Sequence, residues 1–210
     1  MNRLICGCLL GMAWPVAALA QSTDVAPDAL ARKVTEEVLA IVRTDKDIQG
    51  GNHKKVLDLV ESKVLPHFNF TRMTRLAVGA PWRQATSAQQ QSLTNEFRAL
   101  LVHTYTSAFT QYRDQVVEYK PLKLQTGDTD VVVRSLVKQK GGGDPIDIHY
   151  SMEKTDAGWK VYDVTIAGVS LVQNYRSTFS SEIQKSGIDG LIATLRNKNK
   201  TLSQLQAAKK

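Results

Sequence analysis

The chain has 210 residues, and its 27 lysines and arginines against 20 aspartates and glutamates give a formal net charge of +7. Because the basic residues are scattered rather than clustered, this excess does not indicate a nucleic-acid-binding protein. It suits anionic lipid surfaces or acidic protein partners, or simply a well-solvated surface.

The first twenty residues carry the pattern of a secretory signal peptide. Arg3 precedes an apolar run from Leu4 to Leu19, and Ala18-Leu19-Ala20 fits an A-x-A cleavage site. The run is too short and too proline-interrupted for a good membrane span. We therefore expect an exported protein, with residues 1–20 removed by cleavage after Ala20.

The mature chain is expected to contain no cysteine, because Cys6 and Cys8 leave with the signal peptide. This excludes disulfides, thiol chemistry and a thiolate metal site. The remaining residues, roughly 190 of them, suit one domain or one domain with a helical addition. We assign the domain to residues 21–200 and expect the polar residues 201–210 to form a flexible tail.

Helical periodicity dominates the N-terminal half of this domain. A helix is predicted from Asp28, a plausible N-cap, to the region of Gly50-Gly51. Asn52 can cap a second helix that Pro66 stops, and a short third helix ends at Gly79.

The longest predicted helix runs from Ser87 to about Tyr112. Ser87 and Gln90 have the spacing of a capping box at its start. Large apolar residues then recur every fourth position and form a wide stripe along one side. The stripe consists of Leu93, Phe97, Leu101, Tyr105 and Phe109.

The pattern then changes to a period of two residues, which predicts β-strands. Strands are expected at residues 116–124, 131–138, 146–153 and 159–166, joined by glycine-containing turns. Short turns between successive strands favour an antiparallel meander.

After the fourth predicted strand the chain returns to helix. Ala167-Gly168 breaks the strand, Ser170 caps a helix that Gly187 closes, and a short last helix ends near Asn199. Helices, a curved antiparallel sheet of about four strands, and helices again define the α+β class.

Residue patterns typical of catalysis are scarce. Gly168-Val169-Ser170 resembles the start of a nucleophile elbow, but Val172 stands where the final glycine should be, so Ser170 is interpreted as a helix cap. The four histidines have no metal-binding spacing, and we expect no metal site.

Two pairs of polar residues leave alternatives open. Tyr162 and Asp163 are neighbours in a strand and point to opposite faces, so a structural hydrogen bond for each is favoured over acid–base chemistry. The second pair, Tyr175 and Arg176, follows the strand-to-helix junction; Arg176 could contact a lipid phosphate, but an ion pair with Asp163 or Asp189 is the preferred interpretation.

Three stretches of the chain together resemble the MlaC family, also called toluene tolerance proteins, whose members bind phospholipid in the periplasm. They are Trp159–Phe179, reading WKVYDVTIAGVSLVQNYRSTF; Pro66–Phe109, beginning PHFNFTRMTRLAVGAPW; and Ser186–Lys200, reading SGIDGLIATLRNKNK. The resemblance covers most of the chain after about Val34. It implies a sheet wrapped as in nuclear transport factor 2 domains, with helices closing a deep apolar cavity.

Periodicity alone describes the apolar faces as an ordinary packed core, and only the resemblance suggests a cavity. On that reading, aromatic and aliphatic side chains of the long helix and the strands would surround the acyl tails of a lipid, with two more near the mouth. The candidates are Phe97, Leu101, Tyr105, Phe109, Val131, Val133, Ile148, Tyr150, Val164 and Ile166, with Val169 and Leu171 at the mouth.

The resemblance also implies a function without a reaction or a cofactor. Its members carry phospholipid between an outer-membrane lipoprotein–porin complex and an inner-membrane ABC transporter complex that contains a substrate-binding hexamer. This chain would then be a monomeric periplasmic shuttle that maintains outer-membrane lipid asymmetry. The alternatives are an enzyme on the same cone-shaped sheet, using Asp163 and a nearby tyrosine on a small apolar substrate, and a protein-binding adaptor.

Overall fold

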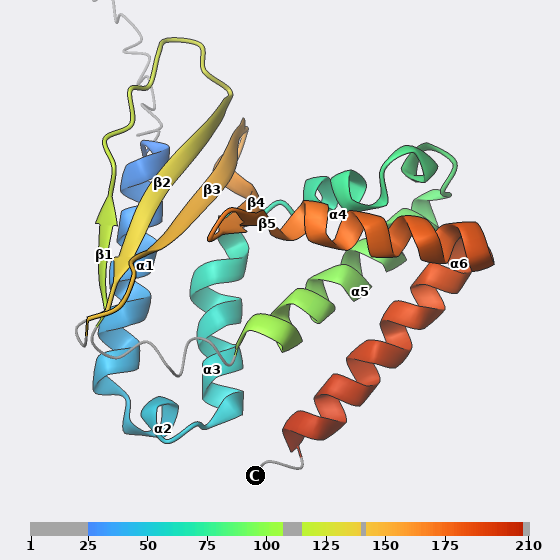
Figure 1. The fold of residues 1–210 in the computed structure, drawn as a ribbon, viewed down its shortest axis with the longest axis horizontal. Helices are drawn as coiled ribbons and strands as arrows, with labels where there is room; N and C mark the ends of the chain where they lie inside the picture. The colour runs from blue at the N-terminus through green and yellow to red at the C-terminus, as the bar shows by residue number, and fades with distance from the viewer. Residues whose placement is uncertain (1–24, 107–114, 140–141, 208–210) are drawn as a thin grey trace, which may run out of the picture.

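The computed structural model describes residues 25–106, 115–139 and 142–207. One antiparallel sheet forms one side of the molecule, and α1 (Pro27–Thr44) lies against it (Figure 1). The other long helices extend away from the sheet beyond its β4–β5 edge. Among the described residues, no helix combines the length and the apolar character that a membrane crossing requires.

The N-terminal helices lie where helix is predicted, but the first ends at Thr44, before Gly50-Gly51, and not every predicted cap is found. Helix α1 begins at Pro27 after Ala26, so Asp28 lies in the first turn and is not the N-cap; the fixed φ of proline suits that position. A short helix, α2 (Lys46–Gln49), was not predicted.

The second predicted helix is confirmed, with an irregular end. Asn52 caps α3 (His53–Leu59) by accepting a hydrogen bond from the Lys55 amide at 3.2 Å. The chain continues as a π-helical turn, η1 (Val60–Val64), and a 3₁₀ turn, η2 (Leu65–His67). Pro66 lies in that last turn and ends the helical segment.

The sheet is a five-stranded meander in the order β1-β2-β3-β4-β5, with every neighbouring pair antiparallel. This confirms the α+β class and adds a two-residue fifth strand. Strand β1 is shorter than predicted because Pro121, which lacks an amide donor, follows it closely. The strands are β1 (Val116–Tyr119), β2 (Asp130–Lys138), β3 (Ile146–Thr155), β4 (Gly158–Ile166) and β5 (Val169–Ser170).

A β-bulge interrupts the pairing of β3 with β4. Ser151 pairs with Asp163 but the next residue, Met152, pairs with Val161, so Tyr162 is the extra residue on β4. A bulge of this kind shifts the alternation of side chains by one residue. It lets both Val161 and Val164 belong to the buried cluster beneath the sheet.

The middle helices are α4 (Phe70–Val78), a 3₁₀ turn η3 (Ala80–Arg83) and α5 (Ser87–Tyr105). Gly79 ends α4 with a positive φ of 74°, as predicted. The capping box of α5 lies one residue earlier than predicted, at Thr86 and Gln89. Gln90 cannot serve there because its side chain donates to the carbonyl oxygen of Trp82 at 2.9 Å.

The C-terminal segment α6 (Leu171–Ala207) consists of two helices that meet at Gly187, where φ is 71° and ψ is −174°. The predicted break at Gly187 is therefore confirmed. The second helix continues to Ala207, beyond the predicted end near Asn199, and packs back along α5 (Figure 1). The Asn199 amide donates to the carbonyl oxygen and a carboxylate oxygen of Glu96, both at 2.9 Å.

Three apolar clusters stabilise the described part of the fold. The largest joins α4, α5 and α6, and at its centre the Phe97 ring meets the rings of Tyr175 and Phe179 edge-on, each at 5.1 Å. A second joins α1, α2 and α3 around Val42 and Val56. The third lies beneath the sheet.

Arg72 fastens α4 to the outer side of the sheet. Its guanidinium donates to Glu153 at 2.7 Å and to Asp130 at 2.8 Å, and it lies 3.6 Å from the centroid of the Tyr162 ring. The arginine side chain is 21% exposed. Removing it would leave two carboxylates with reduced solvation and no cation.

We expect Arg72→Ala to lower the free energy of unfolding by about 2 kcal/mol, less than for a fully buried pair because solvent screens part of the interaction. Urea unfolding measures the change. Arg75→Ala, one turn along the same helix but exposed, should change it by less than about 0.5 kcal/mol. Equal effects of the two substitutions would contradict a role for the Arg72 contacts.

Candidate functional site

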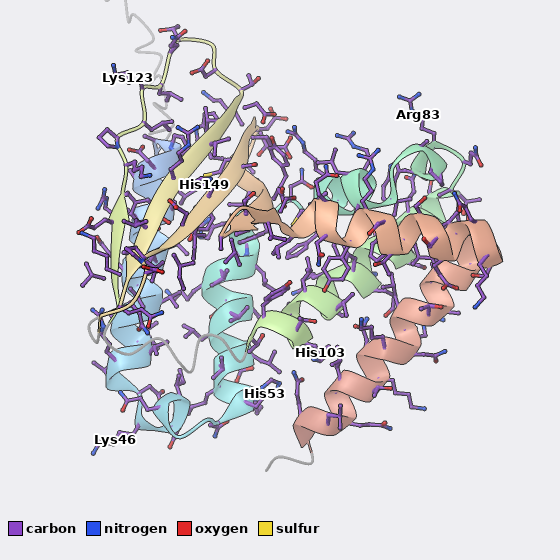
Figure 2. All side chains as sticks on the ribbon, in the orientation of Figure 1. Lys46, His53, Arg83, His103, Lys123 and His149 are labelled. Carbon is purple, nitrogen blue, oxygen red and sulfur yellow. The ribbon has the colours of Figure 1, made fainter. Side chains whose placement is uncertain are left out.

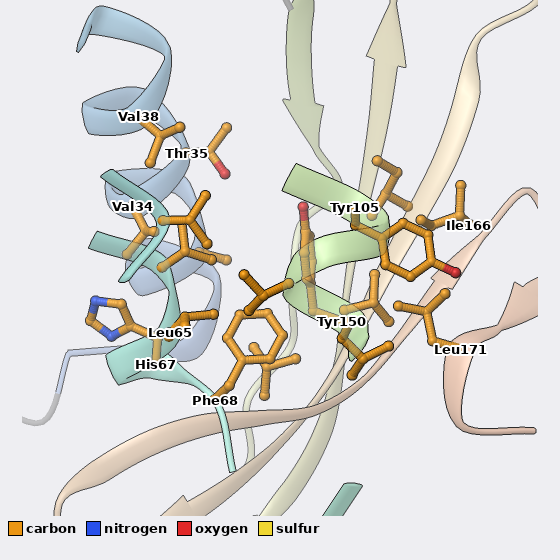
Figure 3. Close-up of a pocket in the computed structure, with 18 of the residues that line it drawn as sticks. Val34, Thr35, Val38, Leu65, His67, Phe68, Tyr105, Tyr150, Ile166 and Leu171 are labelled. Carbon is orange, nitrogen blue, oxygen red and sulfur yellow. The ribbon is translucent and has the colours of Figure 1, made fainter. Parts of the chain in front are cut away.

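An apolar cavity of about 300 Å³ lies between α1 and the inner face of the sheet. The turns η1 and η2 close one side, and the start of α4 and the end of α5 contribute further wall (Figure 3). Ligand cavities of small molecules begin at roughly this volume and are lined mostly by hydrophobic side chains. The cavity is therefore the candidate binding site.

Helix α1 forms one complete wall. Leu30, Val34, Val38 and Val42 recur every fourth residue, so they lie along one side of the helix, and all border the cavity. Leu65 and Phe68 approach this wall from the η2 turn (Figure 3).

The sheet forms the opposite wall mainly through residues of β3 and β4, with Val117 of β1 and Val137 of β2 beside them. Ile148, Tyr150 and Met152 come from β3, as the predicted alternation requires. Strand β4 contributes Val161, Val164 and Ile166, and the bulge between the first two explains their spacing.

The structure brings many of the predicted site residues to this cavity. Whether they contact a lipid stays a prediction. The predicted residues that border the cavity are Leu101, Tyr105, Ile148, Tyr150, Val164, Ile166 and Leu171.

Other predicted site residues lie elsewhere. Phe97 is completely buried between α5 and α6, because Tyr175 and Phe179 cover its ring. Val133 is completely buried in the cluster beneath the sheet, and Val131 packs against that cluster. Val169 is 56% exposed on the outer surface. Phe109 falls outside the described residues.

The wall formed by α1, η1 and η2 was not predicted. Its signal was present in the sequence, since Val34, Val38 and Val42 have helical spacing, but the same spacing describes a helix packed against a solid core. Val60 and Val64 were assigned to a helix without a role in the site.

Polar groups near the cavity are held by partners. The Tyr119 hydroxyl donates to the carbonyl oxygen of Ala31 at 3.0 Å and lies 2.6 Å from the Thr35 hydroxyl, which ties α1 to β1. Burial raises the pKa of Tyr119 above its ordinary value, and its pKa remains raised although the Thr35 contact opposes the effect. Burial likewise raises the pKa of Tyr105, with Tyr175 adding to it. Both phenols therefore stay neutral near pH 7.

The proposed acid–base pair is not assembled in the cavity. Asp163 caps α6 instead, accepting hydrogen bonds from the Ser170 hydroxyl at 2.5 Å and the Val172 amide at 3.1 Å. The Tyr162 hydroxyl donates to Asp130 at 2.5 Å. The structural hydrogen bonds favoured by the sequence are thus confirmed.

Ser170 acts as a helix cap, as predicted, because its hydroxyl accepts a hydrogen bond from the Gln173 amide at 3.0 Å. The predicted ion pair of Arg176 is wrong: within the described ranges, neither Asp163 nor Asp189 lies within salt-bridge distance of it. Asp163 is occupied by the α6 cap, and Asp189 accepts a hydrogen bond from Gln89 at 2.8 Å. No three acidic, histidine or cysteine side chains of the described residues converge on a possible metal site.

The fold and the cavity together define a class of α+β proteins that enclose an apolar site between a helix layer and one antiparallel sheet. The model of the MlaC protein family matches residues 32–197. The chain therefore belongs to the MlaC family.

Individual relatives agree with this assignment. The intermembrane phospholipid transport system binding protein MlaC of Haemophilus influenzae is 22% identical over 175 residues, which are 82% of this chain and 81% of that protein. Toluene tolerance protein ttg2D of Pseudomonas putida is 23% identical over 178 residues, covering 84% and 80% of the two chains.

A solved structure resembles the fold. It is a phospholipid-binding protein from Ralstonia solanacearum in complex with a phospholipid, with a TM-score of 0.77 and 41% sequence identity. The match covers 84% of this chain and 98% of that one.

The packing around Phe97 and Phe68 predicts different losses of stability when each is replaced by alanine. Phe97→Ala should lower the free energy of unfolding by about 3–5 kcal/mol, because the surrounding rings cannot close the space. Phe68→Ala removes the same atoms beside the existing cavity and should cost about 1–2 kcal/mol. Equilibrium urea unfolding compares the two, and a larger loss for Phe68→Ala would contradict the placement of Phe97 in the solid core.

The environment of His67 predicts how the stability of the protein changes with pH. Burial, reinforced by Lys160 and Lys33, lowers the pKa of His67 below its ordinary value, although Glu37 opposes the shift. The folded protein therefore binds this proton less readily than the unfolded chain, and stability should fall as the pH drops below about 6.5. Urea unfolding at about pH 7.5 and 5.5 should show a smaller loss for His67→Gln than for the parent; an equal loss would assign the pH dependence to other groups.

Proposed function

We propose that this protein is a periplasmic carrier that binds phospholipid with its acyl tails inside the cavity between α1 and the sheet. The observation that supports this most directly is an almost wholly apolar cavity in a chain 41% identical to a phospholipid-binding protein that holds a phospholipid. The name of the Haemophilus influenzae relative, a phospholipid transport system binding protein, points the same way.

The cavity wall suits acyl chains because it offers no buried polar atom that lacks a partner. Within the described residues, the buried side-chain atoms without one belong to His53, Arg72, His149 and Asn199, and none of these lines the cavity. An unpaired polar atom facing a lipid tail would cost about 1–3 kcal/mol.

A soluble carrier must cover nearly all of a lipid's tail surface. A diacyl phospholipid has on the order of 30 chain carbons, each worth about 0.8 kcal/mol when it leaves water, so exposed tails would cost roughly 20 kcal/mol. The head group can remain in water. We therefore expect tail number and length to matter more for binding than head-group identity, and no covalent step is needed.

The carrier would shuttle between the two membranes of the cell envelope. The chain belongs to a family with a member named as the binding protein of an intermembrane phospholipid transport system. We propose export through the signal peptide at residues 1–20, a single lipid-binding domain beginning at residue 21, and action as a monomer. Its partners would be an outer-membrane lipoprotein–porin complex and an inner-membrane ABC transporter complex with a substrate-binding hexamer, and its role the maintenance of outer-membrane lipid asymmetry.

Lipid extraction tests the proposal directly. The mature protein, purified from its own periplasm, should yield phospholipid in organic solvent, identified by mass spectrometry. Protein that is consistently empty, and that also takes no lipid from phospholipid vesicles, would refute the carrier.

Two similar substitutions locate the bound tails. Ile166→Asp places a carboxylate in the cavity wall and should reduce bound phospholipid at least about tenfold, because the charge would be desolvated by the tails. Val169→Asp makes a comparable change three residues later, on an exposed side chain, and should leave the lipid content unchanged. Circular dichroism confirms that each variant is folded. An unchanged lipid content in folded Ile166→Asp would exclude this wall.

A further inference from the structure

Several long segments of the sequence lack any acidic residue, and the fold packs two of them together. Residues 62–95 and residues 164–181 contain no aspartate or glutamate. The first includes α4, η3 and the start of α5, and the second includes the first turns of α6. Because α6 packs against both α4 and α5, the two segments share one end of the molecule (Figure 1).

Three arginines extend from these two segments, whose borders carry the acidic partners of Gln89 and Arg72. Arg75 comes from α4, Arg83 from η3 and Arg176 from α6, and all three are exposed. Arg176 lies across the end of α4: a β-carbon added at Gly79 would be 3.5 Å from its guanidinium. In the part of the chain that the structure describes, none of the three has a carboxylate within salt-bridge distance.

Arg72, which lies on the same helix as Arg75, differs from these three arginines because it has acidic partners. Arg72 already binds Glu153 and Asp130 at the border with the sheet. Arg75, Arg83 and Arg176, named here the arginine face, have no such arrangement. Figure 2 shows the Arg83 side chain directed away from the body of the protein.

We infer that the arginine face is a docking surface for a carboxylate-rich protein surface on a membrane. A guanidinium binds a carboxylate through two parallel hydrogen bonds, so arginine suits specific acidic protein surfaces. Electrostatic attraction to a lipid bilayer usually needs four to eight clustered cations or an inserted apolar side chain. The arginine face has three cations, and of the large exposed apolar side chains of the described residues only Val169, in β5 at the sheet edge, belongs to the two segments; the others are at 25, 116, 124, 132 and 205.

The position of the arginine face relates it to the cavity. Phe70 and Met73 of α4 border the cavity, and so does Leu171, the first residue of α6. A partner on the arginine face would thus hold two of the elements that form the cavity wall. The inference extends the proposed function by naming the chemistry of the partner surface.

The test uses inner- and outer-membrane vesicles from the organism that makes the protein, and measures binding by co-sedimentation at about 50 mM and 300 mM salt. The variant R75Q/R83Q/R176Q should bind about tenfold more weakly at low salt, and the difference should shrink at high salt. The control K46Q/K123Q/K198Q removes the same charge from exposed lysines elsewhere and should bind within about twofold of the parent. Figure 2 shows Lys46 and Lys123 far from Arg83.

Vesicle treatments identify the partner chemistry. Binding of the parent should disappear when the vesicles are shaved with protease or when their exposed carboxylates are amidated. Persistent binding to shaved vesicles, or to protein-free vesicles of the extracted lipids, would overturn the inference in favour of bilayer binding. Equal losses in the arginine variant and the lysine control, or unchanged binding by the arginine variant, would also overturn it.

Lipid content separates this inference from the proposed function. Both variants should retain the parent's phospholipid on extraction, because none of the six residues borders the cavity. An empty parent that still binds vesicles through the arginine face would refute the carrier but not the docking surface. If R75Q/R83Q/R176Q fails to fold, Arg83→Gln alone, at an exposed position in η3, should weaken binding at low salt; unchanged binding would overturn the inference.

Discussion

The site depends on one constraint, namely that helix α1 and the sheet present apolar faces to each other without closing the space between them. Two attachments hold α1 in this position. Near its start Leu30 and Ala31 pack on the cluster beneath the sheet, where Tyr119 also binds the helix. Near its end Val38 and Val42 belong to the cluster with α2 and α3. Between these attachments, the side of the helix from Leu30 to Val42 borders the cavity and therefore lacks part of the close packing that interiors normally gain.

The opposite wall depends on polar contacts placed outside the cavity. The bulge at Tyr162 aims Val161 and Val164 inward while the Tyr162 hydroxyl reaches Asp130 on the outer side. Asp163 then binds Ser170 and the Val172 amide, which fixes the point where the sheet ends and α6 begins. Residues that resembled candidates for catalysis therefore serve to position apolar ones. This division keeps charge away from a surface where it would be costly.

Local patterns predicted the elements well but the cavity poorly. Periods of 3.6 and two residues, the Asn52 cap, and the stops at Gly79 and Gly187 depend on neighbours in sequence, and the structure confirms them. The capping box of α5 lies one residue before its predicted position because the Gln90 side chain donates to the carbonyl oxygen of Trp82. The spacing rule for capping boxes does not anticipate this contact. Phe97 and Tyr105 belong to one stripe, yet Phe97 is completely buried in the cluster with α6, whereas Tyr105 packs against that cluster and also borders the cavity. Whether an apolar face meets side chains or empty space is a tertiary property.

Helices α4 and α6 contribute both to the cavity wall and to the arginine face. This shared structure limits how a partner bound at the arginine face can affect lipid binding. Helix α4 is fixed to the sheet through Arg72, and α6 through Asp163, so a displacement at either helix is opposed at the sheet. A partner on the arginine face could alter lipid affinity only by binding one arrangement of these helices better than another. Coupling of this kind is reciprocal: if docking weakens lipid binding, bound lipid weakens docking by the same factor. A loaded carrier and an empty one would then differ in their affinity for the same membrane partner, which is the property that allows a shuttle to leave after its lipid has been exchanged.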